Sequence, residues 1–434
     1  MENEKTNSER RKTLISFLIS AIKIIFLLGF LIFIHESGHF LVAKACKIRV
    51  KEFAIGFGPT IWKKQGKETK YALRLIPLGG FVNMLGEEER SEEEGAFSKA
   101  SIPKRIAVVV AGGAVNIIFG LLVYFILVSS TGNYISPTID TVVPEYAAET
   151  SGIQAGDRIL EIDGKTVRLR SEIDEAIQNS NGSEIIITVQ RGNEQKDIKL
   201  IPSVEETKAI GIYLGVESDD LSSEIKSVYQ NSPAEKIGLQ TGDEILSING
   251  VNAQNDPYKI VELISNSQTD KIDVKVKRNN KEIIFNITPE TQKTYKLGVT
   301  FKIAEKTFLN NIYYGFWDTI DFSTSLIDNL KMMLTGNVSA DQLMGPVGIS
   351  QVVSNTQGIV EFIYMLALVS LSLGVTNLLP FPPLDGGKIV ILLIEWIRRK
   401  PIKENIEIAI QMVGFFLLIG LSLYVTYNDI LRIF

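Results

Sequence analysis

The sequence contains one cysteine and two histidines in 434 residues. The single cysteine, Cys46, excludes an intrachain disulfide and any metal cluster held by several thiolates. The net charge is −5, so no excess of positive charge points to nucleic acid as a partner. Hydrophobic residues make up 45% of the chain and charged residues 22%, which excludes a disordered or collagen-like protein. The two histidines, His35 and His39, are four residues apart.

Four stretches are long and apolar enough to cross a bilayer as helices, which takes about 20 residues each. They lie between Lys23 and Lys44, from Ile106 to Ser130, from about Phe362 to Phe381 and from about Ile406 to Tyr427. A buried helix in a soluble core is the alternative for any one of them. The absence of charge from 106 to 130 favours the membrane interpretation. We therefore expect a polytopic α-helical membrane protein with about four transmembrane helices.

Lysine and arginine near the ends of these stretches predict which side each loop occupies. Segments 40–105 and 388–405 together contain eighteen of these residues, whereas the two terminal segments contain five. The positive-inside rule then places 40–105 and 388–405 in the cytoplasm, and the termini and the region 131–360 outside. The basic N-terminal tail argues the other way.

The polar middle region contains an internal repeat. Tyr146–Gly164 and Ser232–Gly250 align without gaps at an offset of 86, with ten of nineteen positions identical. A helix-like stretch and two alternating, strand-like segments follow each copy. Two copies indicate a duplicated domain rather than a solenoid. Their G-x-x-A/T-G-D-x-I-L-x-I-N/D-G core resembles PDZ domains of the permuted bacterial type, which implies two inserted α+β domains.

This resemblance also implies a partner, because PDZ domains bind peptide termini by adding a strand to a sheet edge. Ile212–Val216 and Lys296–Thr300 resemble the loops that receive the peptide carboxylate. The alternative is a structural module that has no ligand.

The string His35-Glu36-Ser37-Gly38-His39 matches H-E-x-x-H. At positions i and i+4 of a helix, two imidazoles project from one face and can hold one Zn²⁺. Glu36 is then placed as the general base. Ionisable residues within an apolar span are costly, so a functional site is the default interpretation. Two core histidines with a buried, satisfied glutamate are the alternative.

A catalytic zinc site uses three protein ligands, and no other histidine exists. The third ligand must therefore be a carboxylate or Cys46. Cys46 lies nearly two turns beyond His39, toward the end of the span. Asp385 is the better candidate because it follows the third span within Asn377–Lys388, where prolines break the helix and two glycines allow close approach. An aspartate that only caps a turn is the alternative.

At this point the whole chain resembles the site-2 family of intramembrane zinc metalloproteases, especially its bacterial regulator of sigma-E type with tandem PDZ domains. The matching segments are HESGH, NLLPFPPLDGG, the PDZ-like repeat, Phe53–Pro59, Tyr71–Val82, Gly112–Asn116 and Met344–Ser350. Gly113 stands where the family's G-P-x-x-N motif has proline. The resemblance implies a membrane-re-entrant β segment, a bacterial inner-membrane location, and transmembrane protein substrates that are cut within the bilayer. Anti-sigma factors and remnant signal peptides are two such classes.

Two further pairs of residues are candidates for substrate contact. Asn377 or Asn116 would steady the oxyanion, although either asparagine could instead join helices. Leu73 and Leu75 lie in an alternating stretch, Tyr71–Leu75, that predicts a strand whose edge pairs with the unwound substrate. Residues 310–334 predict an amphipathic helix that lies either on the outer leaflet or beneath the PDZ pair.

These features divide the chain into nine segments. They are the N-terminal tail and first span (1–44), a cytoplasmic β segment (45–104), the second span (105–130), two PDZ-like domains (135–205 and 206–302), an amphipathic linker (303–360), the third span (361–388), a cytoplasmic loop (389–405) and the fourth span (406–434). A membrane-anchored peptide-binding scaffold that has lost activity and a zinc-dependent chaperone or sorting factor are the competing functions.

Overall fold

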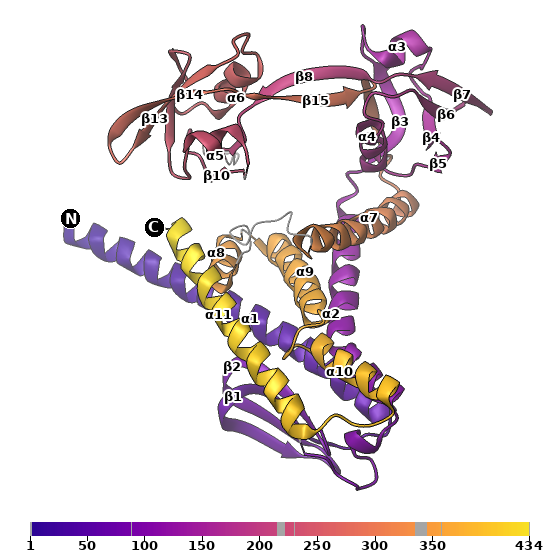
Figure 1. The fold of residues 1–434 in the computed structure, drawn as a ribbon, viewed down its shortest axis with the longest axis vertical. Coiled ribbons are helices and arrows are strands. Elements are labelled where there is room, and N and C mark those ends of the chain that lie inside the picture. The colour runs from indigo at the N-terminus through magenta and orange to yellow at the C-terminus, as the bar shows by residue number, and fades with distance from the viewer. Residues whose placement is uncertain are drawn as a thin grey trace. The chain divides into compact units, whose positions relative to one another are not determined.

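The computed structural model describes residues 2–87, 89–214, 222–229, 231–334, 345–356 and 358–433. The chain forms two compact units (Figure 1). One consists of Met1–Gly132 together with Asn311–Phe434, and the other of Asn133–Asn310. The polar repeat region is therefore an insertion between the two parts of the helical unit.

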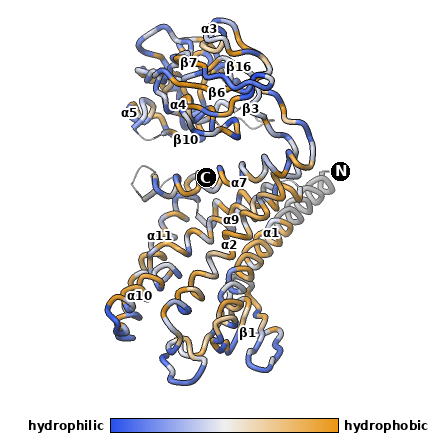
Figure 2. Tube along the Cα trace, turned by 90° about the vertical axis from the view of Figure 1, so that its right-hand side faces the viewer, coloured by the Kyte–Doolittle hydropathy of each residue, from blue (hydrophilic) through white to orange (hydrophobic). Residues whose placement is uncertain are grey.

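Four helices among the described residues are long and apolar enough to cross a membrane. They lie in α1 (Glu2–Ala45), α2 (Ile102–Thr131), α9 (Gly358–Asn377) and α11 (Glu404–Ile433). Figure 2 shows hydrophobic residues along these helices and hydrophilic residues on the loops that join them. The prediction of four membrane-spanning helices is confirmed by their length and composition.

The third predicted span, 361–388, is not one helix. Helix α9 ends at Asn377, and a new helix, α10 (Asp385–Arg398), begins after the proline-containing turn. The predicted loop 389–405 is therefore mostly helical, which corrects the prediction. The stretch Ile389–Ile397 contains apolar residues at helical spacing, so it buries Ile391 and Leu392 against the rest of the unit.

Strands β1 (Val50–Gln65) and β2 (Lys70–Met84) form an antiparallel pair that folds back on itself. Ile55 pairs with both Leu73 and Gly80, and Leu73 pairs with both Ile55 and Trp62. The ladder therefore has four short arms. The arms that contain Ile55 and Leu73 are interior, and the arms 80–84 and 60–65 form the two edges.

Helix α7 (Phe308–Leu334) confirms the predicted helix at 310–334. It packs on α2, where Tyr124 stacks on Phe322 with ring centroids 4.3 Å apart and donates a hydrogen bond to Asp318. A short helix, α8 (Pro346–Asn355), follows. Its first turn is held by the buried Asp429 of α11, which accepts hydrogen bonds from the backbone N–H groups of Gly345 and Gly348. Met344 of the family-like motif lies outside the described residues.

The second unit contains two similar lobes. The first contains β3 (Ile135–Val142), α3 (Ala147–Ser151), β4 (Arg158–Ile162), β5 (Lys165–Thr166), α4 (Arg170–Asn179), β6 (Ile185–Arg191) and β7 (Glu194–Leu200). The second contains β9 (Ile212–Tyr213), β10 (Ser227–Val228), α5 (Pro233–Ile237), β11 (Glu244–Ile248), β12 (Val251–Asn252), α6 (Pro257–Ser265), β13 (Ile272–Arg278) and β14 (Lys281–Ile287). Each lobe has its own apolar core.

The two lobes are nested rather than consecutive. Strand β16 (Val299–Ile303) pairs with β3, and Leu297 lies in the core of the first lobe. Residues 297–303 therefore belong to the first lobe. The predicted second domain, 206–302, included most of them, among them the predicted loop Lys296–Thr300, and this assignment is corrected. Strands β8 (Ser203–Ala209) and β15 (Glu290–Lys296) pair with each other and connect the lobes. Gly215 and Val216 of the other predicted loop lie outside the described residues.

A buried ion pair recurs in both lobes. Asp157 is fully buried and accepts two hydrogen bonds of 2.7 Å from Arg191, which also donates to the Gly152 carbonyl. Arg278 makes the same contacts with Asp243 and Gly238. The Gly-Asp dipeptide of the repeat thus does more than turn the chain. Its aspartate binds the arginine at the end of β6 or β13, and the same arginine also binds the carbonyl at the end of α3 or α5.

Candidate active site

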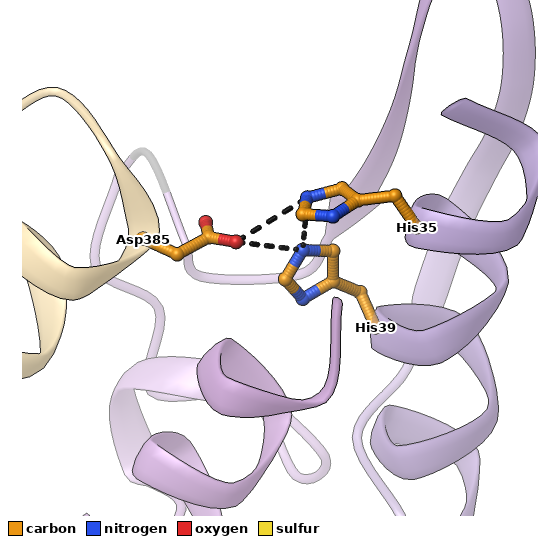
Figure 3. A group of neighbouring side chains, drawn as sticks. All are labelled: His35, His39 and Asp385. Carbon is orange, nitrogen blue, oxygen red and sulfur yellow. Dashed lines mark hydrogen bonds and ion pairs between the residues drawn. The ribbon is translucent and has the colours of Figure 1, made fainter. Parts of the chain in front are cut away.

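Three potential metal ligands converge inside the helical unit (Figure 3). His35 and His39 project from one face of α1, and Asp385 is the first residue of α10. The Nε2 atoms of the two histidines lie 3.2 Å apart, and Asp385 Oδ2 lies 3.3 Å from each of these nitrogens. The aspartate, distant in sequence, thus closes a nearly equilateral triangle with the two imidazoles.

This triangle has the dimensions of a zinc site. Tetrahedral ligands that lie about 2.0–2.2 Å from Zn²⁺ are about 3.3 Å from one another. The three distances among the ligand atoms are 3.2, 3.3 and 3.3 Å. Asp385 Oδ2 is buried and has no hydrogen-bond donor within the described chain. Two imidazoles, one carboxylate and a buried unpartnered oxygen are a donor set that fits Zn²⁺ and leaves a fourth position open.

The surroundings of each imidazole fix which nitrogen faces the triangle. His39 Nδ1 lies 2.8 Å from the Val108 carbonyl oxygen, so Nδ1 carries the proton and Nε2 is free to bind metal. His35 Nδ1 faces two side-chain amides, those of Asn116 at 3.4 Å and Asn377 at 3.5 Å. Asn116 is fully buried, and its Oδ1 has no partner among the described residues. Rotation of that amide would give His35 Nδ1–H an acceptor.

Glycines at the contact between α1 and α2 let the two helices approach closely and leave room for the imidazoles. This feature was not predicted from the sequence. A Cβ added at Gly112 of α2 would lie 2.2 Å from His39 Nε2 and 2.8 Å from His35 Cε1. A Cβ added at Gly38 of α1 would lie 2.4 Å from the Ala111 carbonyl oxygen. The sequence signal was present, since two adjacent glycines interrupt an otherwise bulky apolar helix.

A cavity of about 720 Å³ opens onto the three ligands and Glu36. Its walls include the edge arm Gly80–Met84 and one face of α11 that carries Glu404, Glu407 and Gln411. Gly80 packs directly on Glu36, because a Cβ placed there would lie 3.0 Å from Glu36 Cγ. Lys388 and Glu87 form an ion pair of 2.6 Å at the same cavity. An edge of a β ladder therefore runs beside the three ligands.

The remaining predicted residues lie elsewhere. Leu73 and Leu75 are exposed, but the arm that carries Leu73 is paired on both sides and has no free edge. Of the two free edges, 80–84 is the one that lines the cavity. Asn116 and Asn377 lie behind His35 and do not line the described cavity. Cys46, the alternative third ligand, packs beside a cluster that contains Ala43, Ile48 and Phe97, and does not join the group of ligands.

An H-E-x-x-H helix that is long enough to span a membrane, completed by a carboxylate from another helix, defines an intramembrane zinc metalloprotease. Comparison with known families agrees, because residues 23–421 match Peptidase family M50. The chain belongs to this family.

Two relatives cover nearly the whole chain. It is 32% identical to the regulator of sigma E protease of Haemophilus influenzae over 96% of this chain and 100% of that one. It is also 32% identical to the regulator of sigma-W protease RasP of Bacillus subtilis, over the same shares of the two chains. Among solved structures, the HtrA3 PDZ domain bound to a phage-derived ligand is similar over 21% of this chain and 92% of that chain, at 25% identity and a TM-score of 0.18.

Proposed function

We propose that His35, His39 and Asp385 hold one catalytic Zn²⁺ and that Glu36 is the general base of peptide-bond hydrolysis. The convergence of the three ligand atoms at zinc-compatible distances is the observation that carries this proposal. When bound, the zinc supplies Lewis-acid polarisation of the scissile carbonyl. Glu36 takes a proton from the attacking water and delivers it to the leaving amine.

Asn116 and Asn377 orient His35 rather than stabilise the oxyanion. Both amides lie on the Nδ1 side of the ring, opposite the nitrogen that faces His39 and Asp385. A hydrogen bond at Nδ1 fixes the tautomer and the rotation of a metal-binding imidazole. The role that the sequence suggested for them is therefore replaced by a positioning role.

The edge arm Gly80–Met84 receives the substrate as an added strand. A transmembrane substrate has to unwind before a peptide bond becomes accessible, and lipid offers its backbone groups no hydrogen bonds. The edge supplies such partners, and it lines the cavity beside Glu36. A membrane-re-entrant position for β1 and β2 follows from this role, because the edge must meet the substrate at the depth of the three ligands.

Segments 40–105 and 388–405 lie on the cytoplasmic side, and the PDZ-like lobes lie outside. Glu395 supports a common side for the two basic segments, because it pairs with both Arg90 and Arg105. The proposed substrates are single-span membrane proteins such as anti-sigma factors, and the proposed location is the bacterial inner membrane. Relatives named as regulators of sigma E and sigma W support this proposal. The PDZ-like lobes contact peptide termini or exclude substrates with bulky outer domains.

Glu36→Gln tests the proposal. In liposomes that contain a model single-span substrate, we expect the variant to keep stoichiometric zinc by elemental analysis. Cleavage should fall by about 10²–10⁴-fold, the usual contribution of a general acid or base. Equal substrate capture without cleavage by the parent and the variant would instead support a binding scaffold. A full rate in the variant would remove Glu36 from the mechanism.

A further inference from the structure

A second cavity, of about 570 Å³, lies where the start of α2 meets the end of α10. It shares no lining residue with the catalytic cavity. Seven charged side chains line it, five basic and two acidic: Arg90, Lys99, Arg105, Arg399, Lys400, Glu92 and Glu395. Neither the zinc chemistry nor the substrate edge uses any of them.

Glu395 is already neutralised. Its side chain is 3% exposed and accepts hydrogen bonds from Arg90 at 3.0 Å, from Arg105 at 2.9 Å and from the Ile402 N–H at 2.9 Å. These contacts use both carboxylate oxygens and fix the shape of the cavity wall. Glu395 therefore builds the site and leaves no negative charge to compete with an incoming anion.

Three cations remain available in this cavity. Within the described residues, Lys99 donates only to the Glu92 carbonyl, at 2.9 Å, and Arg399 and Lys400 form no ion pair. They face one exposed carboxylate, Glu92. Cations gathered in a preformed hollow with this excess of charge favour an anion with several oxygens, such as a phosphate group.

The last turns of α10 carry an exposed apolar surface beside this hollow. Apolar side chains at helical spacing face outward there, and Trp396 and Ile397 are 57% and 82% exposed. Leu393 and Ile394 continue the same exposed apolar surface. Exposure of this apolar surface to water would be unfavourable. At a bilayer surface the apolar side chains can contact lipid while the basic residues Arg398–Lys400 and the aromatic ring lie at headgroup level. The first turn of the α2 span, at Ile102, lines the same cavity.

We propose that this cavity binds the headgroup phosphate of an anionic phospholipid. Lys99, Arg399 and Lys400 contact the phosphate oxygens, and Trp396 and Ile397 contact the glycerol and the first part of the acyl chains. Basic pockets between helices at the membrane surface recognise anionic headgroups in this way. A free phosphate would satisfy the cations but would leave the apolar surface of α10 without a role.

Native mass spectrometry of the full chain in detergent tests this site. Phosphatidylglycerol is the probe, phosphatidylcholine the zwitterionic comparison and glycerol phosphate the soluble competitor. The test variant is Lys99→Gln/Arg399→Gln/Lys400→Gln. The matched control is Lys63→Gln/Lys64→Gln/Lys67→Gln, which removes the same charge from exposed positions of the β1–β2 hairpin. Arg90 and Arg105 stay unchanged because they hold Glu395.

We expect the parent and the control to retain phosphatidylglycerol in preference to phosphatidylcholine, and the test variant to retain it at least about tenfold less. Equal loss in both triple variants would reduce the effect to diffuse charge attraction and overturn the site. Displacement of phosphatidylglycerol by stoichiometric glycerol phosphate would overturn the lipid assignment in favour of a free-anion site.

Fluorescence provides a second measurement that does not depend on the triple variant. The chain has three tryptophans, so Trp62→Phe/Trp317→Phe leaves Trp396 as the sole tryptophan. Phosphatidylglycerol brominated on its acyl chains should quench this emission more strongly than brominated phosphatidylcholine at equal content in vesicles. Equal quenching by the two lipids would contradict a headgroup-selective site beside Trp396.

Discussion

Gly112 determines whether the two imidazoles have room to face each other. Its position on α2 faces both rings, and a Cβ there would lie 2.2 Å from His39 Nε2. The neighbouring Gly113 instead faces α9, where a Cβ would lie 2.9 Å from the Gly374 carbonyl oxygen. The paired glycines thus serve two interfaces, one that forms the site and one that packs α2 on α9.

Gly112→Ala should therefore remove the metal. We expect zinc affinity and cleavage to fall at least about 10–100-fold, because the methyl group displaces the His39 ring. Losses of that size are typical when the groups that orient a metal-binding imidazole are removed. Elemental analysis and cleavage of a single-span substrate are the measurements. Gly420→Ala is the control, since it lies in a membrane-spanning helix and its Cβ would meet nothing within 4 Å. Full zinc content in Gly112→Ala would show that the rings can shift without loss.

The site could be predicted where local spacing decides geometry. His35 and His39 share a face because four residues are close to one helical turn, and their Nε2 atoms do lie 3.2 Å apart. Elimination left a carboxylate or Cys46 as the third ligand, and the proline-containing turn after the third span favoured Asp385. The direction in which Asn116 points depends on how α2 is rotated about its axis relative to α1, and no local sequence pattern predicts that rotation. The position of Gly112 was missed for the same reason.

At the scale of elements, the β1–β2 ladder shows why a strand can be predicted while its edge cannot. Alternation in Tyr71–Leu75 correctly indicated a strand. Which arm is interior depends on register, and β1 pairs with β2 three times, through Ile55 with Gly80, Ile55 with Leu73 and Trp62 with Leu73. A proline at Leu73 would consequently disrupt the ladder itself and would not report on substrate pairing.

Cysteine crosslinking tests strand addition at the edge 80–84. In a Cys46→Ala/Glu36→Gln background, Asn83→Cys is combined with single cysteines placed along the unwound segment of a substrate. We expect disulfides at every second substrate position, because side chains alternate along an added strand. Lys64→Cys, on the opposite edge of the ladder, is the control and should form none. Crosslinks with a period of three to four residues would mean that the substrate binds as a helix.

The Asp157–Arg191 pair gives the first lobe a predictable dependence on pH. Burial raises the pKa of Asp157, but the hydrogen bonds from Arg191 and the Gln154 N–H outweigh it, so the pKa lies below its usual value. A carboxylate with a lowered folded-state pKa stabilises the fold above its unfolded pKa of about 3.9, and this stability is lost as the pH falls below that value.

Asp157→Asn should cost about 3 kcal/mol at neutral pH, because it leaves Arg191 without its buried partner. The variant should then lose less stability than the parent as the pH falls below about 4. Hydrogen exchange of the β6 amides in the full chain measures both effects. Asp140→Asn, an exposed site on the same lobe, should follow the parent at every pH. Parallel pH profiles for Asp157→Asn and the parent would assign the acid sensitivity to other groups.

At the scale of the whole chain, the nesting of the two lobes could not be predicted from the sequence. The repeat was clear from ten identities in nineteen positions, but similarity between copies does not say which strand completes which sheet. Strand β16 pairs with β3 across more than 150 residues of chain, so the second lobe interrupts the first. The connection is compact, because β8 and β15 run antiparallel and Ala209 lies opposite Glu290.

This nesting allows the second lobe to be excised. Consider a chain that lacks residues 210–289, with Ala209 joined to Glu290 through an Asn-Gly turn. We expect its first lobe to fold, because β8 and β15 then form a simple hairpin, and its helical unit to keep zinc. If the lobes exclude bulky substrates, the parent should cleave only a substrate whose outer domain has been trimmed, and the deletion should cleave trimmed and intact substrates at similar rates. The same deletion carrying Glu36→Gln should cleave neither. An unchanged preference for the trimmed substrate would leave exclusion to the first lobe or to the helical unit.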